Sequence, residues 1–89
     1  MRRAARIDSN HAEIVAALRK CGASVINLSR DGEGCPDLLV GMLGRNVLLE
    51  VKAEKGRVRP NQQALIATWP GEAYIVRSVD EALAAILRK

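Results

Sequence analysis

The stretch DLLVGMLGRNVLLEVK, residues 37–52, decides how this chain folds. Two apolar runs, residues 37–42 and 46–52, are each the length of a buried strand and are separated by a few turn-forming residues. Gly44 and Asn46 tolerate a positive φ, which suits the tight turn of a hairpin. We therefore expect two antiparallel strands joined by this turn.

The other elements follow from helical spacing, capping residues and turn residues on either side of this hairpin. Apolar residues within 12–20 recur at helical spacing after candidate N-cap side chains at 8–10, and Gly22 ends that helix. The remaining segments predict a strand at 24–28, a helix from Pro60 to about Trp69, a strand at 73–77, and a last helix that begins with the capping box Ser78-Val-Asp-Glu81. The order is α-β-β-β-α-β-α, which predicts an α/β fold with a mixed β-sheet flanked by helices.

Length and composition set the class of the protein. The chain has 89 residues, so we expect a single domain over residues 1–89, with a loose basic segment at 1–7. A hydrophobic fraction of 48% and a charged fraction of 27% exclude a disordered chain. We see no secretory h-region and no membrane-length apolar run, so we expect a cytoplasmic protein without membrane contact, in which Cys21 and Cys35 are free. The net charge of +4 suits a nucleic-acid partner, although many small soluble proteins are equally basic.

Three charged residues of the hairpin carry the chemistry. Glu50 and Lys52 are two residues apart, so they project from one face of their strand, while Val51 points to the core. Asp37 lies at the start of the neighbouring strand, where its carboxylate can reach Glu50 across the hairpin. Two carboxylates suit Mg²⁺ or Mn²⁺, which takes oxygen ligands and serves phosphodiester hydrolysis. The backbone carbonyl of Val51 would add a ligand, and Lys52 would orient the attacking water or steady the phosphate.

A second interpretation makes Glu50 and Lys52 an ion pair on a solvated strand face. The rest of that strand argues against it, because residues 47–49 and Val51 are all apolar. A carboxylate in such a strand is costly unless it is paired or bound to a metal. The pattern therefore favours the catalytic interpretation.

Other polar side chains have structural interpretations. Asn10 and Glu13 have the spacing of a capping box, but Glu13 also lies at the edge of the apolar stripe, where it would face the sheet. His11 is the single histidine, and we expect it on the helix surface without a functional role. Together with Cys21 and Cys35 it does not match the ligand spacing of a structural zinc site.

Several basic residues lie in the loops near these motifs. They would contact DNA phosphates, or they would only solvate the loops that carry them. These residues are Arg30, Arg45, Lys55, Arg57 and Arg59.

The chain resembles the PD-(D/E)XK nuclease superfamily and, within it, the small stand-alone VRR-NUC-type nucleases that are common in phages and prophages. The resemblance covers nearly the whole chain and begins with the helix that holds Asn10 and Glu13. It continues through Gly34-Cys-Pro-Asp-Leu-Leu39, Leu49-Glu-Val-Lys52, Pro60-Asn-Gln62 and Val76-Arg-Ser-Val-Asp-Glu-Ala82. The resemblance implies a restriction-endonuclease-like fold.

The resemblance also implies roles for individual residues. Asp37 and Glu50 would bind the metal, and Lys52 would assist the water. Gln62 would lie close to the site from its helix, and Glu13 on the first helix would complete it.

These observations predict a Mg²⁺- or Mn²⁺-dependent DNA endonuclease with no small-molecule substrate. Its relatives resemble Holliday-junction resolvases, so we expect a homodimer that favours branched DNA over plain duplex, in a bacterial or phage-infected cytoplasm. Two alternatives stay open: a non-catalytic nucleic-acid-binding module on the same fold, and a purely structural or assembly protein. Binding alone needs no carboxylates that face phosphates, which argues against the first alternative.

Overall fold

The computed structural model describes residues 10–29 and 34–88. Its seven elements follow the predicted order, and their bounds lie within a residue or two of those expected from the sequence. The loose segment predicted at 1–7, the candidate caps at 8 and 9, and Arg30 lie outside the described residues. The elements are α1 (His11–Lys20), β1 (Ser24–Asn27), β2 (Leu38–Met42), β3 (Arg45–Val51), α2 (Pro60–Thr68), β4 (Glu72–Val76) and α3 (Val79–Leu87).

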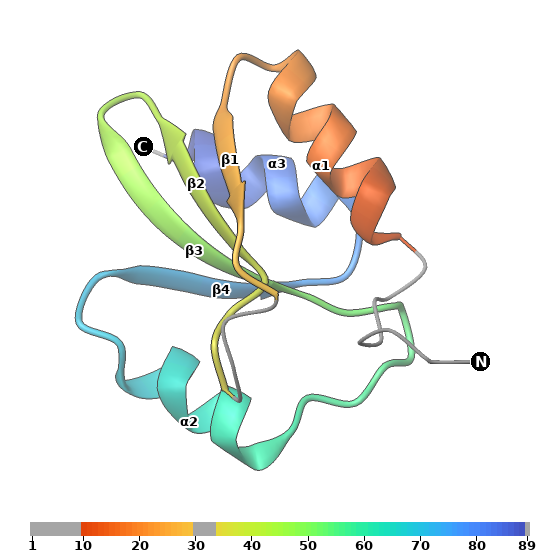
Figure 1. Cartoon of the computed structure of the whole chain (residues 1–89), viewed down its shortest axis with the longest axis vertical. Helices are drawn as coiled ribbons and strands as arrows, with labels where there is room; N and C mark the ends of the chain where they lie inside the picture. Colours follow the sequence, from red (N-terminus) through yellow and green to blue (C-terminus); the bar gives the residue numbers. More distant parts are fainter. Residues whose placement is uncertain (1–9, 30–33, 89) are drawn as a thin grey trace.

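The four strands form one mixed sheet in the order β1-β2-β3-β4. β1, β2 and β3 run antiparallel to one another, whereas β4 is parallel to β3. A parallel neighbour needs a crossover, and α2 lies within it. α1 and α3 pack together on one face of the sheet. α2 contacts β4 on the side away from α1 and α3 (Figure 1). The predicted α/β fold with a mixed sheet flanked by helices is confirmed.

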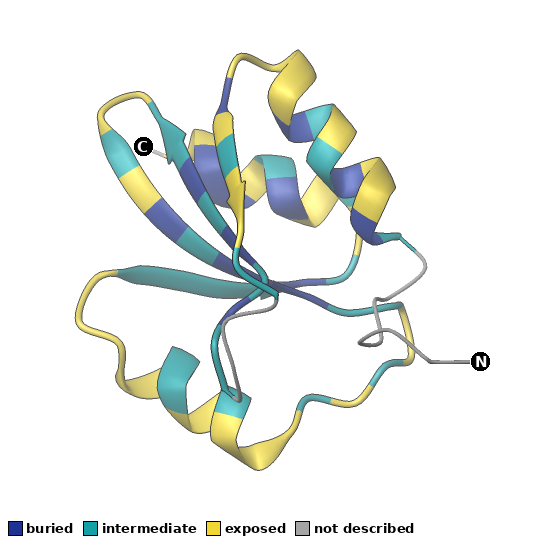
Figure 2. Ribbon diagram, in the orientation of Figure 1, coloured by how far each residue is buried: buried dark blue, intermediate teal, exposed yellow. Residues whose placement is uncertain are grey.

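The core lies between the sheet and the pair α1 and α3 (Figure 2). Leu38 pairs with Leu49 and Val40 with Val47, so these side chains share one face of the sheet. Each of them is fully buried, as is Val51. Because side chains alternate along a strand, the residues between them occupy the opposite face. This alternation places Glu50 on the face away from α1 and α3.

The hairpin between β2 and β3 turns at Leu43 and Gly44. Both have positive φ, 55° and 77°, which is the pattern of a type I′ turn. The expectation that Asn46 would take a positive φ is wrong, because Asn46 lies within β3 and pairs with Gly41. The turn has only two central residues, so Leu43 takes the strained position instead.

The helix caps differ from those expected. The predicted capping box of Asn10 and Glu13 is wrong, since the Asn10 side chain makes no bond to its own helix. At α3, Ser78 Oγ accepts the Glu81 N–H at 3.1 Å, as predicted. The Glu81 carboxylate accepts the Arg77 N–H at 2.8 Å, where a capping box would use the N–H of Ser78.

Arg45 joins β3 to β4 and to the end of α3. Its Nε and Nη2 donate to the two carboxylate oxygens of Glu72. Nη1 and Nη2 also donate to the carbonyls of Ala85, Ile86 and Arg88. These bonds use all five N–H donors of the guanidinium, so the expected phosphate contact of Arg45 is wrong. The hydrogen bond from Arg45 lowers the pKa of Glu72 below its ordinary value.

Within the described ranges, no helix is both long and apolar enough to cross a membrane.

Candidate active site

Glu50 is the buried charge of the sheet. It lies near the end of β3 with 2% of its surface exposed, although both of its strand neighbours point into the core. The Gln62 side-chain amide donates to Glu50 Oε2 at 2.8 Å, and Lys52 Nζ lies 3.6 Å from the same oxygen. A buried carboxylate is tolerated when such partners compensate its lost hydration. The structure thus brings Glu50, Lys52 and Gln62 together.

Lys52 follows β3 directly and shares the face of Glu50, as their two-residue spacing requires. Its backbone is held on both sides: the N–H donates to Val76 O at 3.0 Å, and the carbonyl accepts Asn10 Nδ2 at 3.2 Å. Its side chain is 13% exposed. The backbone of Lys52 is therefore fixed, and its ammonium lies beside Glu50.

Asp37 precedes β2 and is tied to both neighbouring strands. Its Oδ2 accepts the Val51 N–H at 2.8 Å, and its carbonyl accepts the Leu28 N–H at 2.7 Å. Because Val51 stands between Glu50 and Lys52, the first bond fixes the Asp37 carboxylate at the same end of β3 as those two residues. The two carboxylates predicted as metal ligands therefore meet at one end of the sheet.

Gln62 comes to the site from the first turn of α2, which starts at Pro60, a residue that fits a helix start. Its Oε1 accepts the Arg59 N–H at 3.2 Å. A backbone N–H can only donate, so the atom facing it is the amide oxygen and the amide nitrogen faces Glu50. The helix start thus orients the amide toward the carboxylate.

Glu13 does not share these contacts. It is exposed on α1, and within residues 10–29 and 34–88 no hydrogen bond or ion pair joins it to the site. Its position in the first turn leaves the carboxylate in solvent near the end of the helix that Asn10 anchors to Lys52.

Two residues that hold the site were missed by the sequence analysis. Asn10 Nδ2 donates to the carbonyls of both Lys52 and Arg77, and so ties together the parallel ends of β3 and β4. The Arg77 guanidinium donates to Ala53 O at 2.9 Å and to Gly56 O at 2.8 Å. These bonds fix the loop after Lys52. No spacing rule finds such bonds, because they join side chains to backbone carbonyls that are distant in sequence.

The loop that Arg77 holds carries the predicted phosphate contacts. Lys55, Arg57 and Arg59 are all exposed, so their charges are available to a ligand. Their position directly after Lys52 puts these charges on the approach to the site.

His11 is not the surface residue that the sequence analysis expected. Only 6% of it is exposed, so that prediction is wrong. Its position explains the burial: His11 precedes Ile14 and Leu18 by three and seven residues, which puts it on the buried stripe of α1. The spacing was available in the sequence.

The donor set of the site fits a hard cation. No group of three or more His, Cys, Asp or Glu side chains within the described part of the chain is placed to hold a metal. Asp37 and Glu50 offer two carboxylates at this end of β3. Mg²⁺ is commonly bound in this way, by one or two carboxylates with water and phosphate oxygens in the remaining positions.

Comparison with known proteins identifies the fold. No family model matches the sequence, and no curated protein matches it. Among solved structures, a chain described as a VRR_NUC domain superimposes with a TM-score of 0.64 and 23% sequence identity. The match covers 86% of this chain and 94% of the other. The chain therefore has the fold of that VRR_NUC domain, as the resemblance predicted.

Proposed function

We propose that this chain is a metal-dependent nuclease that hydrolyses DNA phosphodiester bonds. One observation carries the proposal: Glu50 is a carboxylate with 2% exposure, placed with Lys52 and Gln62 at the end of an otherwise apolar strand. Replacing a whole buried ion pair by well-packed apolar residues is often neutral or stabilising, so the fold itself does not require a charge at this position. A catalytic role explains why the charge is there, and the likeness to a VRR_NUC domain supports it.

Asp37 and Glu50 would hold Mg²⁺ or Mn²⁺, with the Val51 carbonyl as a further ligand. When bound, such a cation neutralises charge on the phosphate and lowers the pKa of a coordinated water. The Val51 N–H holds one oxygen of Asp37, and the Gln62 amide holds one oxygen of Glu50. Both carboxylates are therefore oriented before any ligand arrives, which lowers the reorganisation needed for catalysis.

Lys52 places a positive charge beside Glu50. Its ammonium would orient the attacking water or steady a phosphate oxygen, in a region where burial strengthens electrostatic interactions. The exposed cations Lys55, Arg57 and Arg59 would hold the neighbouring phosphates of the same strand. Arg77 fixes the start of their loop through the carbonyls of Ala53 and Gly56.

The preferred substrate in this proposal is branched DNA, cut by a homodimer. One chain offers a single pair of carboxylates and a small basic surface. A twofold dimer would present two such centres, which suits two opposed strands at a four-way junction. Light scattering at micromolar concentration, with and without a junction, tests this part. A strict monomer that cuts linear duplex as well as junctions would refute it and leave a generic nuclease.

Cleavage assays test the central proposal. Purified protein with Mg²⁺ or Mn²⁺ should cut DNA when offered linear, circular, flapped and four-way substrates. A chelator should abolish the cleavage, and Ca²⁺ should bind without supporting turnover. Undiminished cleavage in chelator would exclude the mechanism.

Single substitutions separate the roles of the site residues. Asp37→Ala and Glu50→Ala should lose both cleavage and metal binding, as measured by calorimetry. Lys52→Ala should lose cleavage but retain metal binding, because an ammonium is not a metal ligand. For Glu13→Ala, a fall in activity without a fall in thermal stability would support a role at the site. Equal loss of metal affinity in the Lys52 and Glu50 variants would show that the role given to Lys52 is wrong.

A further inference from the structure

A hollow of about 340 Å³ lies between α1 and β1, apart from Glu50. Val25 and Asn27 line it from β1, and their register with β2 puts them on the helix face of the sheet, opposite the face of Glu50. We call this hollow the α1–β1 slot. Its other walls come from α1 and include His11, Val15, Ala16 and Arg19. Its volume is within the range of small-ligand pockets.

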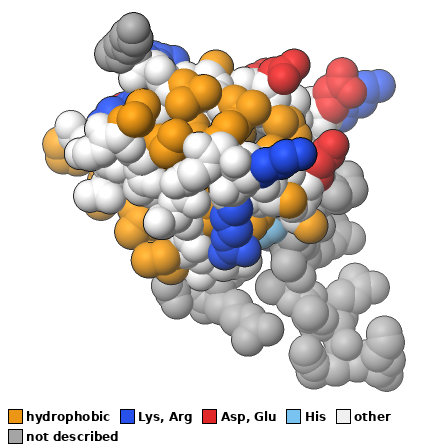
Figure 3. Space-filling model, turned by 90° about the horizontal axis from the view of Figure 1, so that it is seen from above, with side chains coloured by type: hydrophobic (Ala, Val, Ile, Leu, Met, Phe, Trp, Pro, Cys, Tyr) orange, Lys and Arg blue, Asp and Glu red, His pale blue; other side chains and the backbone are white. Residues whose placement is uncertain are grey.

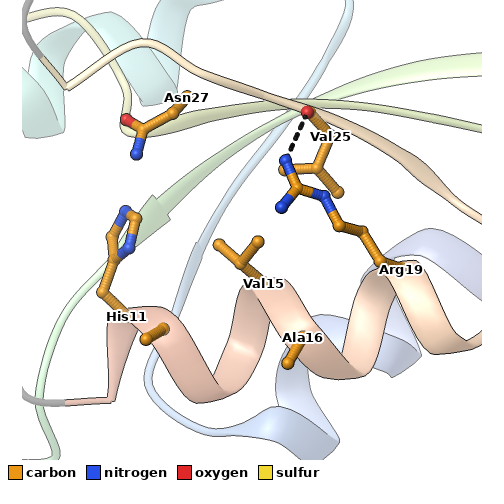
Figure 4. A pocket seen from close by; sticks show the side chains of 7 residues that line it. His11, Val15, Ala16, Arg19, Val25 and Asn27 are labelled. Carbon is orange, nitrogen blue, oxygen red and sulfur yellow. Dashed lines mark hydrogen bonds between the residues drawn. The ribbon is translucent and has the colours of Figure 1, made fainter.

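His11 is the unusual group of the slot. It is more than nine-tenths buried, and its Nε2 has no hydrogen-bond partner within residues 10–29 and 34–88. A buried polar atom without a partner destabilises the fold, so such an atom calls for an explanation. In Figure 4 the imidazole stands at one end of the slot and faces Asn27 across it. A ligand atom in this space would satisfy the Nε2 atom.

Asn27 makes the same end of the slot a donor site. Its Oδ1 accepts both the N–H and the Oγ–H of Ser29, at 2.9 and 2.6 Å. The oxygen is thereby occupied, and the amide nitrogen is directed toward His11 (Figure 4). Two N–H groups of an amide and a protonated imidazole Nε2 can together bind an oxygen acceptor.

The opposite end of the slot carries a cation. Arg19 donates through Nη2 to Val25 O at 3.1 Å, and its side chain is exposed. One carbonyl uses only one of the five N–H donors of a guanidinium. Val15 projects from α1 between the two polar ends (Figure 4), and Ala16 also lines the slot, so the middle of the slot is apolar. Figure 3 shows that the face of the molecule seen from above carries Lys and Arg side chains among hydrophobic ones.

We propose that the α1–β1 slot binds one unpaired nucleotide of the DNA substrate. A base carbonyl oxygen would lie between His11 and Asn27, the sugar would lie on Val15 and Ala16, and the phosphate would contact Arg19. An apolar middle between a donor end and a cationic end matches the parts of a nucleotide in order. Enzymes that modify DNA bases bind the extruded base in a pocket through hydrogen bonds to its edge and apolar contacts. The proposal takes DNA as the substrate from the proposed function.

The slot is connected to the candidate active site through both of its walls. His11 follows Asn10, whose amide holds the Lys52 carbonyl. Asn27 precedes Leu28, whose N–H donates to the carbonyl of Asp37. The donor end of the slot thus lies at the same end of the sheet as the carboxylates, on the opposite face. A DNA strand that is cut at Glu50 would pass around this end of the sheet and place a neighbouring nucleotide in the slot. The slot would therefore favour DNA with unpaired bases beside the cut.

The single histidine gives the test its probe, because the imidazole NMR signals of the protein belong to His11 alone. Metal-free protein in chelator is titrated with tetrathymidylate, with a tetramer of the same backbone that lacks bases, and with inorganic phosphate. We expect tetrathymidylate to shift the His11 signals to saturation. The two other ligands should bind about tenfold more weakly or worse, because they lack the base oxygen that His11 and Asn27 would bind.

Substitutions in the slot provide the matched controls. Ala16→Leu narrows the slot from its α1 wall at an exposed position and should weaken tetrathymidylate binding by about tenfold. Ala84→Leu adds the same side chain at an exposed position of α3 and should leave the affinity unchanged. Thermal melting of both variants checks that they fold.

Three results would overturn the proposal: His11 signals that stay fixed while DNA binds, equal affinity for the tetramer without bases, or a response to tetraglutamate peptide in place of DNA. The last would indicate a protein partner. Because binding is measured without metal, the slot and the nuclease can fail separately. A chain that binds tetrathymidylate in the slot but never cuts DNA would lose the proposed function and keep the slot.

Discussion

The two faces of the sheet are built in opposite ways. On the face toward α1 and α3, every strand residue of the central pair β2 and β3 that belongs to the core is fully buried and aliphatic. On the other face, Leu39, Leu48 and Ile75 are only half-buried, and Ile26 is 57% exposed. The deeply buried side chain of that face is the carboxylate of Glu50. One face therefore supplies the stability of the fold, and the other gives up apolar burial to hold a charge.

Substitutions at two adjacent residues, one on each face, should have the largest effects. Leu49→Ala removes a fully buried side chain from the stable face and should cost about 2–5 kcal/mol, which is much of the stability of a small domain. Glu50→Gln keeps the shape of the side chain on the other face and should change the melting temperature by only a few degrees. It should lower cleavage by roughly 10²–10³-fold, the usual loss when a preorganised electrostatic group is removed.

Circular dichroism melting and single-turnover cleavage, run on both variants, give the two readouts. We expect the two variants to fail in different measurements. The Leu49 variant should melt early while its folded fraction cuts normally. The Glu50 variant should stay folded but lose its cleavage activity. If Glu50→Gln melted as early as Leu49→Ala, the charge would be part of the structural core. The two faces would then not differ in the way described.

A substitution of Gln62 tests how the carboxylate of Glu50 is held on its face of the sheet. Gln62→Ala removes the amide that orients Glu50, and we expect a loss of about 10–100-fold in cleavage or metal affinity, as is usual for residues that orient a ligand. Gln63→Ala, at the exposed neighbouring position of α2, is the matched control and should cut normally. Equal activity of the two variants would show that the amide of Gln62 has no part in holding the carboxylate.

A substitution of Arg45 tests the contribution to stability of the bonds at the edge of the face toward α1 and α3. Arg45→Gln removes most of the hydrogen bonds to Glu72 and to the end of α3, and should lower the melting temperature by several degrees while activity per folded molecule is unchanged. The lowered pKa of Glu72 adds a pH dependence. Its contribution to stability is complete above the ordinary glutamate pKa and is lost as the pH falls through the lowered value. The wild type should therefore lose more stability than the variant between neutral and acidic pH.

Thermal melts of both proteins over that pH range check the sign. Equal slopes for the wild type and Arg45→Gln would contradict the link between Arg45 and Glu72. A loss of cleavage in folded Arg45→Gln would instead return this residue to the phosphate contacts that the sequence suggested.

The sequence predicted the order of the elements because each has a local signal: an apolar run, helical spacing, or a turn residue. It also predicted that Glu50 and Lys52 share a face, since strand alternation alone requires this. The sequence did not predict side chains that form hydrogen bonds with residues outside their own helix or strand. Asn10 has the sequence of a cap and instead bonds the carbonyls of Lys52 and Arg77, and Arg45 turns from solvent to the end of α3. Such choices depend on tertiary partners that local spacing does not contain.

The smallest expected effect concerns the turn that sets the register of both faces. Leu43 holds φ at 55° with 70% of its surface exposed, so its side chain gains little from burial while its backbone is strained. Asn tolerates this conformation, and Asn-Gly is the preferred pair for a type I′ turn. Leu43→Asn should therefore stabilise the fold by about 0.5–1 kcal/mol, which raises the melting temperature by roughly 2–8 °C for a domain of this size.

Leu43→Ala is the control at the same position, because it removes the exposed side chain without easing the backbone. We expect no gain from it. A slip of one residue in this hairpin would exchange the two faces and bring Glu50 under the helices. A turn that favours the native register should therefore leave cleavage unchanged in Leu43→Asn. A gain in the Ala variant equal to that of Asn would show that the exposed side chain, and not the backbone of Leu43, is what costs stability here.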